Sequence, residues 1–246
     1  MTRATTPRAT TASRSRRPAA KPAAAPVDAL GDQWLVITGL SWEQYVTIND
    51  AIVERPSVRM IYCDGRLTLL TKSRRHGRYA GCLDFLVAEL CKELNVLMET
   101  AGSATFRRQE KNGGIEGDKT FYFGENADRM KGPQNIDLDV QPPPDLAIVI
   151  EVSNSGEDSV IVWGRLGVTE VWRFDPIAME CSFWSRRSVR TYRRIERSLA
   201  FPTLRPADVI EQMRLADDLS MGEWWSNLGR WVREEIVPRK RRGGNR

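Results

Sequence analysis

Two acidic side chains bracket an apolar segment in the middle of the chain, and both could take part in metal-ion or acid–base chemistry. The segment reads Pro142-Pro143-Pro144-Asp145-Leu-Ala-Ile-Val-Ile-Glu151-Val152. A largely β-branched run between a proline cluster and a Ser/Asn/Gly turn is typical of a buried strand. A carboxylate near the end of such a strand must be paired, protonated or bound to a metal, because burying it alone is very costly. Glu151 is therefore our first candidate metal ligand.

Asp145 is the nearest acid along the same strand, but it cannot share an ion with Glu151. Strand alternation puts the two side chains on one face, yet six residues at about 3.3 Å each separate them by roughly 20 Å. Metal–oxygen bonds are only about 2.0–2.6 Å long. We therefore expect Asp145 to shape the entrance of the strand, as acids often do after prolines.

Asp118 is a better partner, because it stands at the start of another strand. The segment reads Glu116-Gly-Asp118-Lys119-Thr-Phe-Tyr-Phe. If this strand pairs with 145–152, Asp118 could approach Glu151 across one strand spacing of about 4.8 Å. Two such carboxylates would hold Mg²⁺ or Mn²⁺ and leave positions for water and a phosphate oxygen. Taken by itself, an acid at position 118 is more often an exposed turn residue than a metal ligand. Glu116 could assist Asp118 as a second or substitute ligand, because the two residues share strand parity.

The elements that must position these acids follow from hydrophobic periodicity and turn residues. Apolar residues at helical spacing predict a long helix over about 75–94, and Asp64-Gly65 is a strong hairpin signal. We expect strands over 58–63, 66–70, 96–99, 104–108, 119–123, 145–152, 168–175, 181–184 and 189–194, and helices over 41–53, 158–166, 206–214 and 220–236. This order predicts a mixed α/β (α+β) fold rather than a regular βαβ array.

Charge and composition divide the chain into a body and two basic ends. Residues 1–26 hold six basic residues and no acid, and residues 239–246 hold five, so the net charge of +5 leaves the body acidic on balance. We expect a disordered tail over 1–28, one globular domain over 29–205, a helical extension over 206–238 and a basic tail over 239–246. Basic arms often add sequence-independent attraction to nucleic acid, although a solubilising tail is an equal alternative.

Cysteine usage and hydropathy favour a cytoplasmic protein. The four cysteines form no CxxC pair and His76 is the single histidine, which argues against a zinc site. The longest apolar runs are strand-sized, so we expect no membrane span. The N-terminus lacks the apolar core of a secretory signal, which leaves a reducing cytoplasm as the expected location.

Five short segments together resemble the Uma-two family of restriction endonuclease-like domains, within the PD-(D/E)XK nuclease superfamily. The resemblance covers roughly residues 36–195. The segments are Asp64-Gly-Arg66, His76-Gly-Arg78, Glu116-Gly-Asp118-Lys-Thr-Phe-Tyr-Phe, Pro144-Asp145-Leu-Ala-Ile-Val-Ile-Glu151-Val, and Arg165-Leu-Gly167-Val-Thr-Glu170-Val-Trp172. The resemblance implies a nuclease core of αβββαβ order with an added N-terminal hairpin and C-terminal helices. It also implies a metal site at Asp118 and Glu151.

The chain departs from the family pattern at the lysine that such sites use. A lysine is expected two residues after the second acid, where this chain has Ser153, or from the following helix, where it has Ser159. Lys119 is the nearest candidate in the sequence, although alternation puts it on the face opposite Asp118. His76 could orient a water molecule or contact phosphate, and it could equally serve in capping and packing.

Three functions remain open at this point. The first is a Mg²⁺-dependent DNA endonuclease, with Asp118, Glu151, His76 and Lys119 as candidate catalytic residues. The second is a nuclease-like fold that binds DNA or a protein without cutting, since the usual lysine is missing. The third is an interaction module held by the tryptophan-rich C-terminal helices; a homodimer is compatible with each of them.

Overall fold

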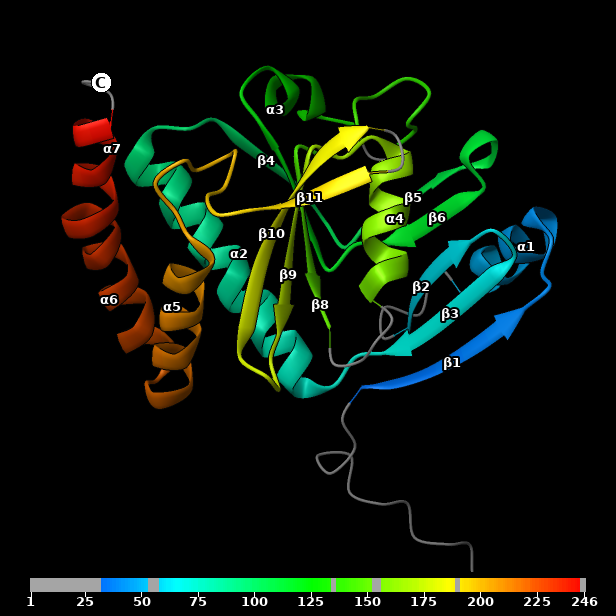
Figure 1. The fold of residues 1–246 in the computed structure, drawn as a ribbon, viewed down its shortest axis with the longest axis horizontal. Coiled ribbons are helices and arrows are strands. Elements are labelled where there is room, and N and C mark those ends of the chain that lie inside the picture. Colours follow the sequence, from blue (N-terminus) through cyan, green and yellow to red (C-terminus); the bar gives the residue numbers. More distant parts are fainter. Residues whose placement is uncertain (1–31, 53–57, 134–135, 152–155, 189–190, 244–246) are drawn as a thin grey trace, which may run out of the picture.

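The computed structural model describes residues 32–52, 58–133, 136–151, 156–188 and 191–243, which form two β-sheets and the helices around them. Figure 1 shows the layers: helices cover the outer face of a large sheet, one helix lies between the two sheets, and the small sheet follows. Among the described residues, no helix is both long enough and apolar enough to cross a membrane. The tail expected over 1–28 lies outside the described residues.

The large sheet has six strands in the order β11-β10-β9-β8-β7-β4. Only β8 and β9 run parallel, and the helix α4 connects them; the other neighbours are antiparallel. The strands are β4 (Met98–Gly102), β7 (Lys119–Phe123), β8 (Leu146–Ile150), β9 (Glu170–Asp175), β10 (Glu180–Ser188) and β11 (Thr191–Ile195). Together with the helices α2 (Arg74–Leu94) and α4 (Gly156–Leu166), they give the order α2-β4-β7-β8-α4-β9, which is the expected αβββαβ core.

The small sheet has five antiparallel strands in the order β1-β3-β2-β6-β5. They are β1 (Gln33–Thr38), β2 (Val58–Cys63), β3 (Arg66–Thr71), β5 (Thr105–Arg108) and β6 (Gly113–Glu116). Asp64 and Gly65 both have positive φ, 47° and 83°, as a two-residue hairpin turn requires. The helix α1 (Trp42–Ile52) covers this sheet, with Tyr45 stacked on Tyr62 at 4.6 Å between ring centroids.

Strand alternation supplies each face of the large sheet with its own core. Leu146, Ile148 and Ile150 pack on the side of α2, whereas Ala147 and Val149 pack on the side of α4. The α4 core also takes in Ile61 and Ile115 from the small sheet, so α4 joins the two sheets. The helix α4 begins at Gly156, five residues after Glu151, and Gly167 ends it with a φ of 100°.

Three further helices complete the outer layer. α5 (Pro206–Asp218) is followed by α6 (Met221–Trp231), which runs through the π-helical turn η3 (Val232–Ile236) into α7 (Val237–Gly243). Trp224 is fully buried and donates its indole N–H to the carbonyl of Gln212, so it is a core residue. The described part of the expected basic tail, 239–243, is helical rather than irregular.

Several expectations need correction at the level of individual strands. The structure adds β1 and β6, which the sequence did not signal, and it adds the helices η2 (Gln109–Lys111) and α3 (Glu125–Met130) within connections. The expected strand over 104–108 forms, but it belongs to the small sheet. Gly113 and Gly114 resemble a turn in the sequence, yet they form part of the β6 strand, which pairs with β2 and β5. Gly114 is required there because the Tyr45 ring packs so closely on it that a Cβ atom would collide with the ring.

Candidate active site

The acids Asp118 and Glu151 come together where the large sheet meets the small one. β7 and β8 are antiparallel with Lys119 opposite Ile148, so extending this register sets Asp118 opposite Val149 and on the same face. The Asp118 Oδ2 atom accepts a hydrogen bond of 2.9 Å from the backbone N–H of Ile150. Asp118 therefore lies beside the backbone of the residue that precedes Glu151, as the expected pairing of the two strands requires.

Gly117 sets the local path of the chain into Asp118. A Cβ atom at Gly117 would lie 2.8 Å from Thr120 Cγ2 and 3.3 Å from the buried Trp163 ring. Any larger residue would push the chain away from α4 and move the following carboxylate with it. The glycine is thus required by close packing rather than by its backbone angles.

Two cationic side chains hold Asp118 from opposite sides. Arg59 Nη1 lies 2.7 Å from Asp118 Oδ2, and His76 Nε2 lies 2.8 Å from Oδ1. Arg59 is 1% exposed and His76 is fully buried. Burial opposes ionisation of Asp118, but the charge of Arg59 and the bond from His76 outweigh it and hold the pKa of Asp118 well below its usual range. Asp118 is therefore ionised at neutral pH.

His76 forms a second short contact that decides its charge. The Nδ1 atom of His76 lies 2.7 Å from Asp32 Oδ2. Burial lowers the pKa of His76, but the hydrogen bonds to Asp118 and Asp32 outweigh burial, so the pKa is raised. Burial also raises the pKa of Asp32, but the bonds from His76 and from Ser73 lower it below its ordinary value. Ionised carboxylates only accept hydrogen bonds, so both ring nitrogens donate and the ring is an imidazolium. His76 is thus a clamp for Asp118, with no lone pair left for a metal or a proton.

Glu151 lies in a different environment from Asp118. Arg173 on β9 binds its Oε2 with Nε at 3.0 Å and Nη2 at 2.5 Å, whereas the buried Oε1 has no hydrogen-bond partner. Burial raises the pKa of Glu151, and Arg173 offsets only part of that increase. The two acids therefore differ in proton affinity, and one oxygen of Glu151 can take a further ligand.

Lys72 and Glu116 complete the group. The Lys72 Nζ atom lies 3.4 Å from Glu116 Oε1 and 3.6 Å from Asp118 Oδ1. Burial raises the pKa of Glu116, and Lys72 opposes that increase. Lys72 stands in the link between β3 and α2, directly before Ser73, whose hydroxyl caps α2.

The donor set suits an ion that needs few protein ligands. Within the described part of the chain, no group of three or more His, Cys, Asp and Glu side chains is arranged to hold a metal ion. Mg²⁺ is often held by one or two carboxylates, with water and substrate phosphate supplying the rest. The unpartnered, buried Oε1 of Glu151 beside ionised Asp118 fits that requirement.

Other residues singled out in the sequence lie elsewhere or act structurally. Lys119 points to the opposite face, where its Nζ lies 2.6 Å from Asp84 Oδ2, so the expectation of a catalytic Lys119 is corrected. Asp145 accepts hydrogen bonds from the Phe123 N–H and from Asn126 Nδ2, both at 2.8 Å, which is the expected structural role. The hydroxyl of Ser159 accepts a bond of 3.4 Å from Arg59, and Ser153 lies outside the described residues.

The sequence reasoning missed Arg59, Lys72, Asp32 and Arg173. A signal existed for Arg59, because it is the single charged residue in the strand Val-Arg-Met-Ile-Tyr-Cys. A charged side chain in such a strand needs a buried partner. Lys72 and Asp32 carry no comparable signal, since Lys72 stands in the link between β3 and α2 and Asp32 directly precedes β1.

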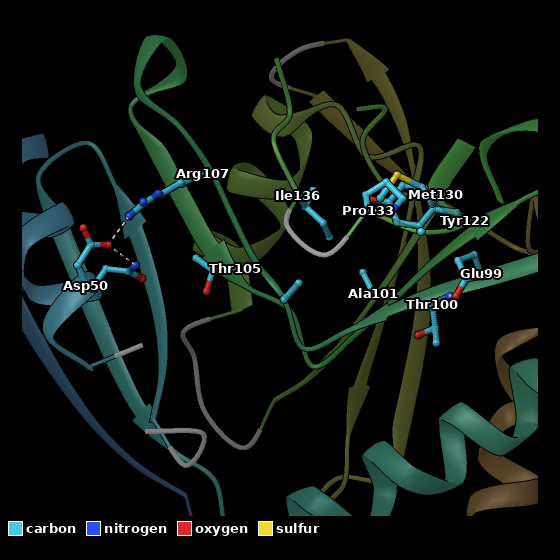
Figure 2. Close-up of a pocket in the computed structure, with 13 residues that line it drawn as sticks. Asp50, Glu99, Thr100, Ala101, Thr105, Arg107, Tyr122, Met130, Pro133 and Ile136 are labelled. Atoms are coloured by element: carbon cyan, nitrogen blue, oxygen red, sulfur yellow. Dashed lines mark hydrogen bonds and ion pairs between the residues drawn. The ribbon is translucent and has the colours of Figure 1, made fainter. Parts of the chain in front are cut away.

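Two pockets flank the acid group. A pocket of about 460 Å³ reaches Glu151 and is lined by Arg173, Trp184 and Arg194 among others. Figure 2 shows a second pocket, of about 690 Å³, between Asp50 and Arg107 of the small-sheet layer and Tyr122 of the large sheet. Glu151 lines the first pocket, and none of the candidate acids is among the residues that line the second.

Comparison with known proteins identifies the family. A family model named Uma2, described as "Putative restriction endonuclease", matches residues 42–220. A search of curated proteins finds no match. A solved structure titled as a "putative nuclease belonging to DUF820" from Anabaena variabilis is 13% identical, with a TM-score of 0.44, over 66% of this chain and 96% of that one. Because the family model spans well over half of its length, the chain belongs to the Uma2 family.

Proposed function

We propose that this chain is a Mg²⁺-dependent endonuclease that hydrolyses phosphodiester bonds in DNA. One observation carries the proposal: ionised Asp118 is bonded to the N–H of Ile150, and the next residue, Glu151, has a buried oxygen without a partner. Membership of the Uma2 family supports the nuclease part of the proposal. The basic residues at both ends of the chain support DNA as the partner.

Asp118 and Glu151 would hold the metal in this proposal, and Mn²⁺ could replace Mg²⁺ because both prefer oxygen ligands. When bound, such an ion would polarise a water molecule and stabilise negative charge on the phosphate. The residues of the chain prepare the acids for that task. Arg59 and His76 keep Asp118 ionised and fixed, and Arg173 orients Glu151. The 460 Å³ pocket would admit a phosphate to Glu151.

A second candidate function is binding of DNA or a protein without cleavage. This candidate is favoured by the contacts that already neutralise the Asp118 carboxylate. Its oxygens accept hydrogen bonds from Arg59, His76 and the Ile150 N–H. A carboxylate so engaged gives up part of its stabilisation when a metal binds. This candidate predicts salt-sensitive DNA binding with no strand breakage.

The experiment is cleavage of supercoiled plasmid by the purified full chain with Mg²⁺, Mn²⁺ or EDTA. We expect nicked or linear product with metal, loss of product in Asp118→Asn and Glu151→Gln, and unchanged product in Lys119→Met, which removes a lysine on the opposite face. Thermal unfolding of each variant checks that it is folded. Intact plasmid with both metals, alongside normal DNA binding, would favour the second candidate instead.

A further inference from the structure

Lys72 differs from the other cations around the acids in how its charge is used. Arg59 is buried, and its guanidinium is bound by the Glu116 carbonyl, Asp118 and Ser159. Lys72 has a side chain that is 17% exposed, and its ammonium donates a long hydrogen bond of 3.4 Å to Glu116. An ammonium has three donors. Lys72 therefore keeps donor capacity at a position that solvent can reach.

The charges around Lys72 leave it available to an anion. Asp118, which lies 3.6 Å from the Lys72 ammonium, has closer cationic partners in Arg59 at 2.7 Å and His76 at 2.8 Å. Glu116, its nearer partner, lies 3.4 Å away, so neither carboxylate holds the Lys72 ammonium in a short hydrogen bond. Arg173, which is also accessible, already uses two of its donors on Glu151.

We propose that Lys72 is the side chain that binds the phosphate to be cleaved and stabilises the charge that develops on it. This inference rests on the proposed nuclease function and adds a catalytic residue to it. In the reaction a water oxygen forms a bond to phosphorus, the P–O ester bond breaks, and one proton passes, in net, from the water to the departing oxygen. Lys72 stays protonated throughout, because its part is to neutralise the phosphoryl oxygens.

The link before α2 suits this role, because it holds Lys72 between both sheets. Thr71 ends β3, and Ser73 is fixed by its cap on the His76 N–H and by the bond from its own N–H to Asp32 Oδ1. The stem of Lys72 is thus tied to the same residues that orient Asp118. A phosphate that approaches Asp118 would meet an ammonium already positioned 3.6 Å from its Oδ1 atom.

The test compares Lys72→Met and Lys72→Arg with Lys119→Met, a matched removal of one lysine from the far face of β7. We expect Lys72→Met to lower kcat by about 10²–10³-fold, the usual loss for one donor to a developing oxyanion. Lys72→Arg should recover part of the rate, and Lys119→Met should keep it. Unfolding midpoints of the three variants exclude a folding defect as the cause.

A second readout does not depend on cleavage. Binding of a labelled oligonucleotide duplex is followed by fluorescence anisotropy at several salt concentrations, in the Glu151→Gln background. Loss of one phosphate contact should lower the log–log salt slope by about 0.9 in Lys72→Met and leave it unchanged in Lys119→Met. If the chain binds DNA with that difference but never cleaves, the nuclease proposal fails while the phosphate contact stands. Equal salt slopes for the two variants would overturn the role of Lys72, and so would cleavage by Lys72→Met at the wild-type rate. A chain that neither binds nor cleaves DNA would also overturn it.

Discussion

Replacing Arg59 by methionine tests the ion pair that holds the candidate site together. Arg59 and Asp118 are 1% and 0% exposed as side chains, and their closest atoms lie 2.7 Å apart. Arg59 also donates to the Glu116 carbonyl at 2.9 Å and to Ser159 at 3.4 Å. Removing one partner of a buried pair leaves the other charge uncompensated, which costs about 3–5 kcal/mol of folding free energy. We expect Arg59→Met to destabilise the fold by that amount.

The chain offers a matched control for this substitution. Arg107 and Asp50 form an ion pair of similar length, 2.8 Å, but their side chains are 41% and 57% exposed. Exposed pairs contribute about 0.2–1 kcal/mol, so Arg107→Met should cost much less. Both variants are compared by urea unfolding at pH 7.5, followed by tryptophan fluorescence.

A double-mutant cycle separates the pair from the packing of the arginine stem. The double variant Arg59→Met/Asp118→Asn should lose about 1–3 kcal/mol less unfolding free energy than the two single variants lose in total. The reason is that the second change removes the charge that the first left unpaired. Equal costs for Arg59→Met and Arg107→Met, or strictly additive losses in the cycle, would refute the view that this buried pair anchors the site.

Three further outcomes follow from the same contacts. Burial raises the pKa of Glu151, so the ionised acid destabilises the folded chain, and Glu151→Gln should raise the thermal unfolding midpoint at pH 8. The same substitution should abolish the added stability that Mg²⁺ gives the wild type. A lower midpoint for Glu151→Gln would contradict this expectation. The raised pKa of His76 contributes stability that is fully present below its unfolded value of about 6.5 and is lost as pH rises through the folded value. Urea midpoints of the wild type should therefore fall as pH rises above about 6.5 and stay flatter in His76→Gln. Gly114→Ala should cost about 1–3 kcal/mol because its Cβ meets the Tyr45 ring, while Gly81→Ala, with open space around it, should cost nothing in the same unfolding assay.

The sequence was sufficient for the elements that repeat a local pattern. The long helix α2, the Asp64-Gly65 hairpin and the strand before Glu151 each carry their signal within a few residues, and all three form as expected. The distance argument that set Asp145 aside also led to the pairing of β7 with β8. These inferences succeed because periodicity and strand spacing are local properties.

The remaining part of the site depends on contacts between the two sheets. Arg59 comes from β2 and Lys72 from the link after β3, so both reach Asp118 only because α4 joins the small sheet to the large one. No local pattern encodes that junction. His76 was recognised as a candidate, but its role as a cation between Asp32 and Asp118 needs both acids in place, and Asp32 precedes it by 44 residues.

The most direct test of the central claim is Mn²⁺ binding to the full chain, measured by isothermal titration calorimetry at pH 7.5 without DNA. If Asp118 and Glu151 together form one metal site, the wild type should bind one ion, and both Asp118→Asn and Glu151→Gln should lose it while Lys119→Met retains it. Absence of binding in the wild type, or binding that survives in both acid variants, would contradict the claim that these two carboxylates make a metal site.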